Sequence, residues 1–132
     1  DIFENNDIWN LGQMCRAMFE NTFILGFLTY NGSVLAAEKM DDKSKQLILN
    51  LPISDSIEEQ IYHLLQKKNL KNTIINLDKL KNQYPFNIYT KQRMIGVIYN
   101  HQNEIQSHYI ESIISNQYNM IIFISNTTHL IT

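Results

Sequence analysis

Two residues of this chain have the side-chain types from which a thiol-dependent hydrolase builds its reacting centre. Cys15 is the only cysteine among 132 residues, and His108 lies between Ser107 and Tyr109 near the other end of the chain. A thiol attacks a carbonyl carbon as the thiolate, which a nearby imidazole and a helix N-terminus both favour. The pattern therefore predicts Cys15 as nucleophile and His108 as the base and later the acid.

The remaining composition narrows the possible functions. The 11 basic and 13 acidic residues are scattered along the chain and give a net charge of −2, so we expect no nucleic acid partner. No window reaches the roughly 18 uninterrupted apolar residues of a membrane span, so no membrane is expected either. His63 and His129 have no paired acidic or thiol ligands at metal spacing, and the glycines form no phosphate-binding pattern. No cofactor or metal is predicted.

Length and cysteine usage suggest where the protein works. A chain of 132 residues is sufficient for one compact domain, which we expect to span 1–132. One cysteine cannot form an internal disulfide, which favours a reducing, intracellular compartment, either cytoplasm or nucleus. Because the chain opens on Asp1, it is expected to be a processed product or a domain cut from something longer.

The N-terminal half contains the elements that would position the cysteine. Residues 12–20 predict a short helix that starts near Cys15. Asn31-Gly32 between two apolar runs is the preferred two-residue turn of a β-hairpin, which would join 23–30 to 33–40. Residues 46–53 are predicted to form a strand. Ser56 and Glu59 match a capping box that opens an amphipathic helix with Ile57, Ile61, Leu64 and Leu65 on one face.

The C-terminal half is predicted to be mostly strand and to carry the histidine. Short strands are expected at 73–77, 94–99, 108–115 and 118–125, with a polar connection over 78–87. The strands expected at 94–99 and 118–125 are apolar and weakly charged, so an uncovered edge of either would favour pairing with another chain, and we expect a covering partner. The fold class that follows is α+β, with a cysteine-bearing N-terminal helix packed on an antiparallel sheet.

The segments around Cys15 and His108 resemble the two boxes of the ubiquitin-specific protease family of deubiquitinases. The first box of that family is Asn-Leu-Gly-x-x-Cys, which Asn10-Leu11-Gly12-Gln13-Met14-Cys15 reproduces. Its histidine box is similar to Ile95-Gly96-Val97, Asn100-His101 and Ser107-His108-Tyr109. Between the boxes, Leu49–Ile53 and Ser56–Glu59 resemble a strand and a helix of the family.

The resemblance implies a papain-like fold and isopeptide hydrolysis of ubiquitin or ubiquitin-like conjugates. The matching family position makes Asn10 the donor to the oxyanion. The residue that orients the imidazole should lie on the strand after His108, and we expect it to be Asn126, with Ser125 as the second choice. Ubiquitin or a ubiquitin-like protein would be the partner.

The departures from the family leave other functions open. Cys15 and His108 are only 93 positions apart (108 − 15), so the thumb would be largely missing, and one cysteine cannot build the zinc fingers. An inactive scaffold or protein-binding module within a larger assembly is therefore the alternative. A small papain-like hydrolase of the ovarian-tumour type is a third reading.

Each assigned residue also has a purely structural explanation. A lone cysteine on a helix often fills a core, and His108 can be an ordinary strand residue. Asn10 can simply cap its helix, and Asn126 can belong to a polar terminus. The joint occurrence of the four residues favours the catalytic interpretation.

Overall fold

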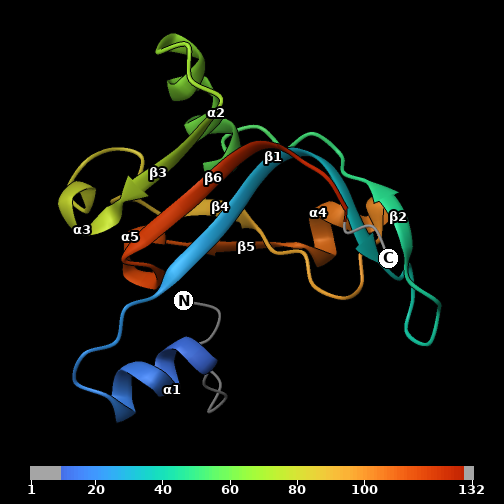
Figure 1. Cartoon of the computed structure of the whole chain (residues 1–132), viewed down its shortest axis with the longest axis horizontal. Coiled ribbons are helices and arrows are strands. Elements are labelled where there is room, and N and C mark those ends of the chain that lie inside the picture. The colour runs from blue at the N-terminus through green and yellow to red at the C-terminus, as the bar shows by residue number, and fades with distance from the viewer. Residues whose placement is uncertain (1–9, 130–132) are drawn as a thin grey trace.

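A computed structural model of the chain describes residues 10–129. The elements follow one another along the chain from a helix to a long final strand (Figure 1). In order they are α1 Leu11–Met18, β1 Leu25–Ala36, β2 Lys45–Ile48, α2 Ile57–Lys67, β3 Asn72–Asn76, α3 Leu77–Leu80, β4 Thr90–Arg93, the 3₁₀ turn η1 His101–Asn103, α4 Glu104–Ser107, β5 Tyr109–Ser112, α5 Ile114–Gln117 and β6 Met120–Thr127.

The main sheet has four strands in the order β2-β1-β6-β3, and β4 with β5 forms a separate antiparallel pair. β1 pairs with β6 in parallel, whereas β2 and β3 run antiparallel to their neighbours. The predicted α+β class is confirmed, but the sheet is mixed rather than antiparallel. Pairing between strands about 95 positions apart leaves no local signal in the sequence, because it depends on the whole fold.

The predicted hairpin at Asn31-Gly32 is wrong, because both residues lie inside the continuous strand β1. Gly32 has φ of 125°, and a Cβ at this position would lie 2.0 Å from the carbonyl oxygen of Thr127. Glycine is therefore needed for the close approach of the β6 backbone, a role that glycine often has inside strands. The dipeptide that typically marks a turn here marks a contact between two strands.

The core lies between the main sheet and α2. α2 begins at the cap Ser56, whose hydroxyl accepts the N–H of Glu59, as predicted. It buries Ile57, Ile61 and Leu65, whereas Leu64, expected on the same face, is exposed. The three buried side chains pack in one cluster with Leu28 of β1 and with residues of β6. A second cluster joins Ala36, Leu47, Leu49 and Tyr99 at the β2 end of the molecule. Burying each such side chain contributes roughly 1.5–3 kcal/mol.

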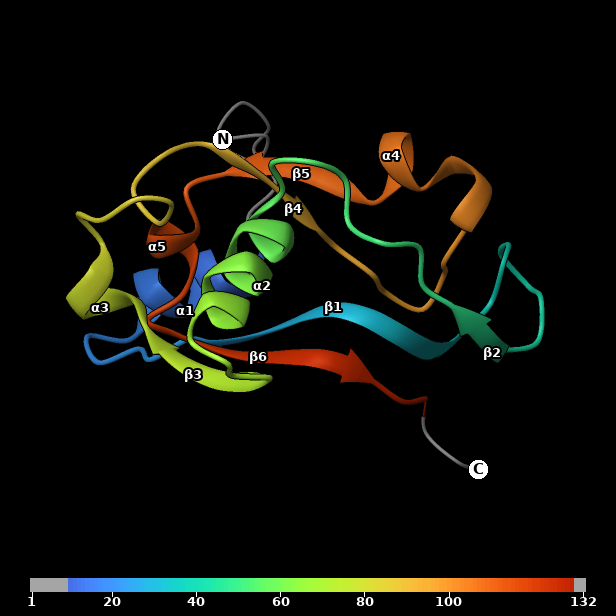
Figure 2. The same ribbon diagram turned by 90° about the horizontal axis from the view of Figure 1, so that it is seen from above.

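Other predicted elements differ from the structure in their bounds or their existence. The strand expected at 46–53 is only β2, and β5 and β6 fall within or beside their expected ranges. The strand expected at 94–99 is wrong, since the paired strand of that region is β4, before Met94. Figure 2 shows α2, β4 and β5 on one side of β1, β6 and β3.

No described helix is long and apolar enough to cross a bilayer.

Candidate functional site

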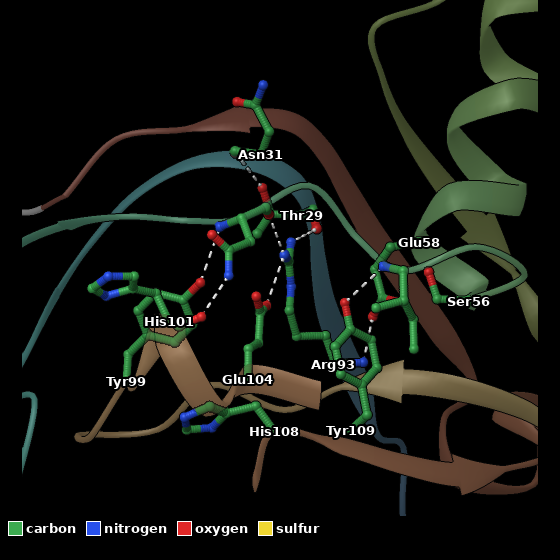
Figure 3. A network of polar contacts seen from close by, with 12 residues as sticks. Thr29, Asn31, Ser56, Glu58, Arg93, Tyr99, His101, Glu104, His108 and Tyr109 are labelled. Atoms are coloured by element: carbon green, nitrogen blue, oxygen red, sulfur yellow. Dashed lines mark hydrogen bonds and ion pairs between the residues drawn. The ribbon is translucent and has the colours of Figure 1, made fainter. Parts of the chain in front are cut away.

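Arg93, at the end of β4, bonds through its guanidinium to four other residues (Figure 3). It is almost completely buried, and its guanidinium forms an ion pair with Glu104 of α4 at 3.2 Å. The same group donates to the carbonyl oxygens of Asn50 at 2.7 Å, Thr29 at 2.9 Å and Tyr30 at 3.0 Å. Arg93 therefore joins β4, α4, β1 and the segment before α2 at one point.

The position of these carbonyl groups explains why an arginine is needed. β2 pairs with β1 only from Ser33 onward, so Thr29 and Tyr30 lie where β1 has no neighbour on that side. Unpaired backbone carbonyl groups in a buried place cost free energy, and the planar guanidinium can satisfy several of them at once. The arginine closes an open strand edge that would otherwise need another strand.

Glu58, on the first turn of α2, is a second buried acid of this cluster, in addition to Glu104. One carboxyl oxygen accepts the backbone N–H of Arg93 at 2.9 Å, and the other has no hydrogen-bond partner within residues 10–129. Only 1% of the residue is exposed, and this burial raises the pKa of Glu58 to about 7, against the smaller opposing effect of the hydrogen bond from Arg93. The carboxyl group therefore changes its charge near neutral pH.

Two tyrosines fix the loop over this cluster. The hydroxyl of Tyr99 accepts the N–H of Asn50 at 3.0 Å, and that of Tyr109 accepts the N–H of Ile53 at 3.1 Å. Burial raises the pKa of Tyr99 to about 12 and also raises that of Tyr109, so both phenols stay neutral. Like the guanidinium of Arg93, the two tyrosine hydroxyls bond to backbone groups and so fix the position of the loop.

His108, predicted as the base, has both ring nitrogens occupied by backbone groups. Its Nε2 accepts the N–H of Asn100 at 3.0 Å, which places the proton on Nδ1, 3.3 Å from the carbonyl oxygen of Met94. The ring is buried and lies 5.4 Å from the ring of Tyr99. Accepting a substrate proton would require one of these bonds to break, and the histidine as placed fastens the loop between Met94 and Asn100.

Cys15 lies on α1, away from His108. In Figures 1 and 2, α1 and α4, which precedes His108, lie apart. A cavity of about 320 Å³ beside α1 is lined by Asn10, Arg16 and Met94, among others, but by neither Cys15 nor His108. The structure does not bring the predicted nucleophile and base together.

The two predicted asparagines also have other positions. Asn10 caps α1, where its side-chain oxygen accepts the N–H of Gln13 at 2.9 Å, so the structural explanation accounts for it. Asn126 lies exposed on β6, opposite Asn31 of β1, and makes no hydrogen bond to His108. The four residues are thus spread over α1, the start of β5 and the end of β6.

A different histidine contacts a hydroxyl group. His129 Nδ1 lies 3.0 Å from Ser33 Oγ, and the same oxygen accepts the backbone N–H of His129 at 3.2 Å. Ser33 is buried on β1 and borders a cavity of about 340 Å³, together with Asn31 and Asn126. No sequence pattern predicts this pair, since the two residues are 96 positions apart and nothing local links them. Among the described residues, no three acidic, histidine or cysteine side chains cluster to hold a metal ion.

A match to a family of known proteins decides between the functions that the sequence left open. The family model for erythromycin esterase matches residues 2–127, nearly the whole chain. The chain belongs to the erythromycin esterase family. The ubiquitin-specific protease resemblance is therefore wrong, and with it the expected papain-like fold, the isopeptidase and cysteine protease function, and the ubiquitin partner. Its boxes were short, and the structure gives their residues local roles: Asn10 caps a helix, and His108 fastens a loop.

The fold of this chain is also seen in part of a solved structure. The chain is similar to the crystal structure of a succinoglycan biosynthesis protein, with a TM-score of 0.62 and 16% identity. The alignment covers 87% of this chain and 26% of that chain, so the described fold corresponds to about a quarter of its neighbour's length. At this level of identity the likeness concerns the fold.

Proposed function

We propose that this chain is one part of a carboxylic ester hydrolase of the erythromycin esterase family. The observation that carries the proposal is the family match over residues 2–127. Hydrolysis of an ester adds water across the acyl C–O bond and releases an acid and an alcohol. An enzyme for this step needs a base or nucleophile for the attack and donors for the oxyanion.

In this proposal, the chain forms the structural support of the active site and does not supply the reacting groups. Three groups with suitable chemistry already bond to the backbone: His108 through both nitrogens, Arg93 through three carbonyl groups, and Glu58 through one of its two oxygens, which accepts the N–H of Arg93. The alignment covers only 26% of the structural neighbour, so the reacting groups would then come from polypeptide that corresponds to the rest of that neighbour. The Arg93 cluster would keep the sheet rigid beneath them.

The test compares this chain with the longest polypeptide in which it occurs naturally. Both are assayed for hydrolysis of p-nitrophenyl acetate and for opening of the lactone ring of erythromycin. We expect hydrolysis by the longest natural polypeptide and none above the buffer rate by the chain alone. Absence of hydrolysis of either ester by the longest polypeptide would overturn the esterase proposal. Equal activity of the two would overturn the supporting role of this chain.

The Ser33–His129 contact favours a second candidate, in which the chain hydrolyses esters by itself. A serine within 3.0 Å of an imidazole nitrogen is the arrangement from which a hydroxyl nucleophile is activated, and the cavity beside Ser33 offers space for an acyl group. If the chain alone is active, Ser33→Ala should abolish that activity and Ser107→Ala, a serine of α4, should not. Retained activity in Ser33→Ala excludes the pair.

A further inference from the structure

One face of the main sheet is apolar and has no described element in front of it. Side chains alternate between the two faces of a strand, and paired residues of neighbouring strands share a face. Six apolar side chains lie on the side away from α2, and we refer to them as the open face. They are Leu25, Phe27, Ile74, Met120, Ile122 and Ile124.

The register places these six residues next to one another. Leu25 pairs with Met120 and Phe27 with Ile122 across β1 and β6, and Ile74 of β3 pairs with the same Ile122. The alternate residues, among them Leu28 and Phe123, are buried in the core with α2. In contrast, Phe27 is 66% exposed and Ile74 is 64% exposed. Figure 1 shows no described helix in front of these strands, and Figure 2 shows α2, β4 and β5 together on the opposite side of them.

The sequence of β6 is typical of a strand that is buried on both faces. Met120 to Ile124 is an unbroken apolar run, and β6 lies in the centre of the sheet beside its parallel partner β1. Strands of parallel pairs are usually covered on both faces, because the crossover connections place helices there. The open face carries no charged residue, and its β3 rim is formed by Asn72 and Asn76. A charged or strongly hydrated partner would not fit such a surface.

We propose that the open face binds amphipathic helices from the remaining part of an erythromycin esterase fold. The inference rests on the proposed function, in which this chain supplies one part of a larger hydrolase. Its physical basis is the apolar second face of a partly parallel sheet, together with the coverage of only 26% of the structural neighbour. Helices are the expected cover, because α2 covers the opposite face in the same way. The apolar stripes of the helices would pack across β1, β6 and β3.

Thiol labelling tests whether the open face is covered. In a Cys15→Ala background, Phe27→Cys is introduced, and Val97→Cys serves as the control, since Val97 is 85% exposed and lies off the sheet. Each variant is made in the chain alone and in its longest natural polypeptide, and the rate of reaction with a maleimide is measured. We expect the Phe27→Cys thiol to react at least roughly tenfold more slowly in the longest polypeptide, and the Val97→Cys thiol to react equally in both.

The other outcomes are equally informative. Equal labelling of the Phe27→Cys variant in both polypeptides would overturn the proposal, and Ile74→Cys checks the result at a second strand. Protection in the chain alone, together with a doubled solution mass, would replace the helices by a second copy of this chain. If the Phe27→Cys thiol is protected in a polypeptide that hydrolyses no ester, the covering of the open face is supported and the proposed esterase activity is not.

Discussion

The carboxylate of Glu104 and the guanidinium of Arg93 meet at 3.2 Å with almost no exposure to solvent. A buried ion pair stabilises a fold over hydrophobic alternatives only weakly, but removing one partner leaves the other charge uncompensated. In this protein the guanidinium also holds three backbone carbonyl groups. The cluster therefore stands at the point where β1, β4 and α4 meet.

Replacement of this arginine should be among the most damaging substitutions in the chain. Arg93→Met leaves Glu104 and the carbonyl groups of Asn50, Thr29 and Tyr30 without their donors, and we expect a loss of about 3–5 kcal/mol in the free energy of unfolding. Urea denaturation measures this value. Lys91→Met, an exposed change on the same strand, should alter it by less than about 0.5 kcal/mol. A similar stability for both variants would contradict the structural role of Arg93.

Glu58 should make the stability depend on pH near neutrality. Its pKa is about 7 in the folded protein and 4.5 ordinarily, so the folded state binds the proton more tightly than the unfolded state. The resulting stabilisation is fully present below about pH 4.5 and is lost as pH rises to about 7, with a total change of about 3 kcal/mol. Unfolding measured between pH 4 and 8 should show this slope. Glu58→Gln should remove it, whereas Glu111→Gln, on the exposed side of β5, should retain it.

The two glycines at 32 and 96 provide a matched pair for testing the close strand contact. Gly32→Ala introduces a Cβ into the backbone of Thr127 at a positive φ, and we expect a loss of at least about 2 kcal/mol or failure to fold. Gly96→Ala has nothing within 4 Å of the new atom and should stay within about 1 kcal/mol of the parent protein. Thermal unfolding followed by circular dichroism distinguishes the two. Equal stability would mean that β1 and β6 do not approach at this point.

Substitution of the only cysteine should leave any ester hydrolysis intact. Cys15 is half-buried on α1 and lies apart from His108. We expect Cys15→Ala to retain the full kcat/KM of the longest natural polypeptide for p-nitrophenyl acetate, and to change stability by less than about 1 kcal/mol. An electrophilic ubiquitin probe should form no adduct with the parent chain. A loss of hydrolysis of a hundredfold or more in Cys15→Ala would restore a role for the thiol.

Local sequence patterns predicted those parts of the fold that local physics determines. The helix α2 was predicted because Ser56 caps it and because Ile57, Ile61 and Leu65 recur at helical spacing. The hairpin prediction failed because Asn31-Gly32 satisfies a contact with Thr127, which lies 95 positions after Gly32. The parallel β1–β6 pair belongs to the same class of long-range features.

The candidate site was less predictable, because the partners of a side chain determine its chemistry. His108 has the residue type and neighbours of a catalytic base, yet the N–H of Asn100 and the carbonyl of Met94 occupy its ring. Arg93 was not singled out, since an arginine at the end of a short strand carries no signal of burial. The predicted compartment and the single-domain organisation stay predictions.

The strand order also determines when this protein can fold during its synthesis. β1 is completed early, but its central partner β6 is among the last described segments to leave the ribosome, and β3 reaches the sheet only through β6. Until then the apolar face of β1 that packs on α2 lacks its parallel neighbour, and sheets built from distant strands form slowly. Holding by a chaperone over this interval would limit aggregation, and slow translation near residues 120–127 would prolong the exposure.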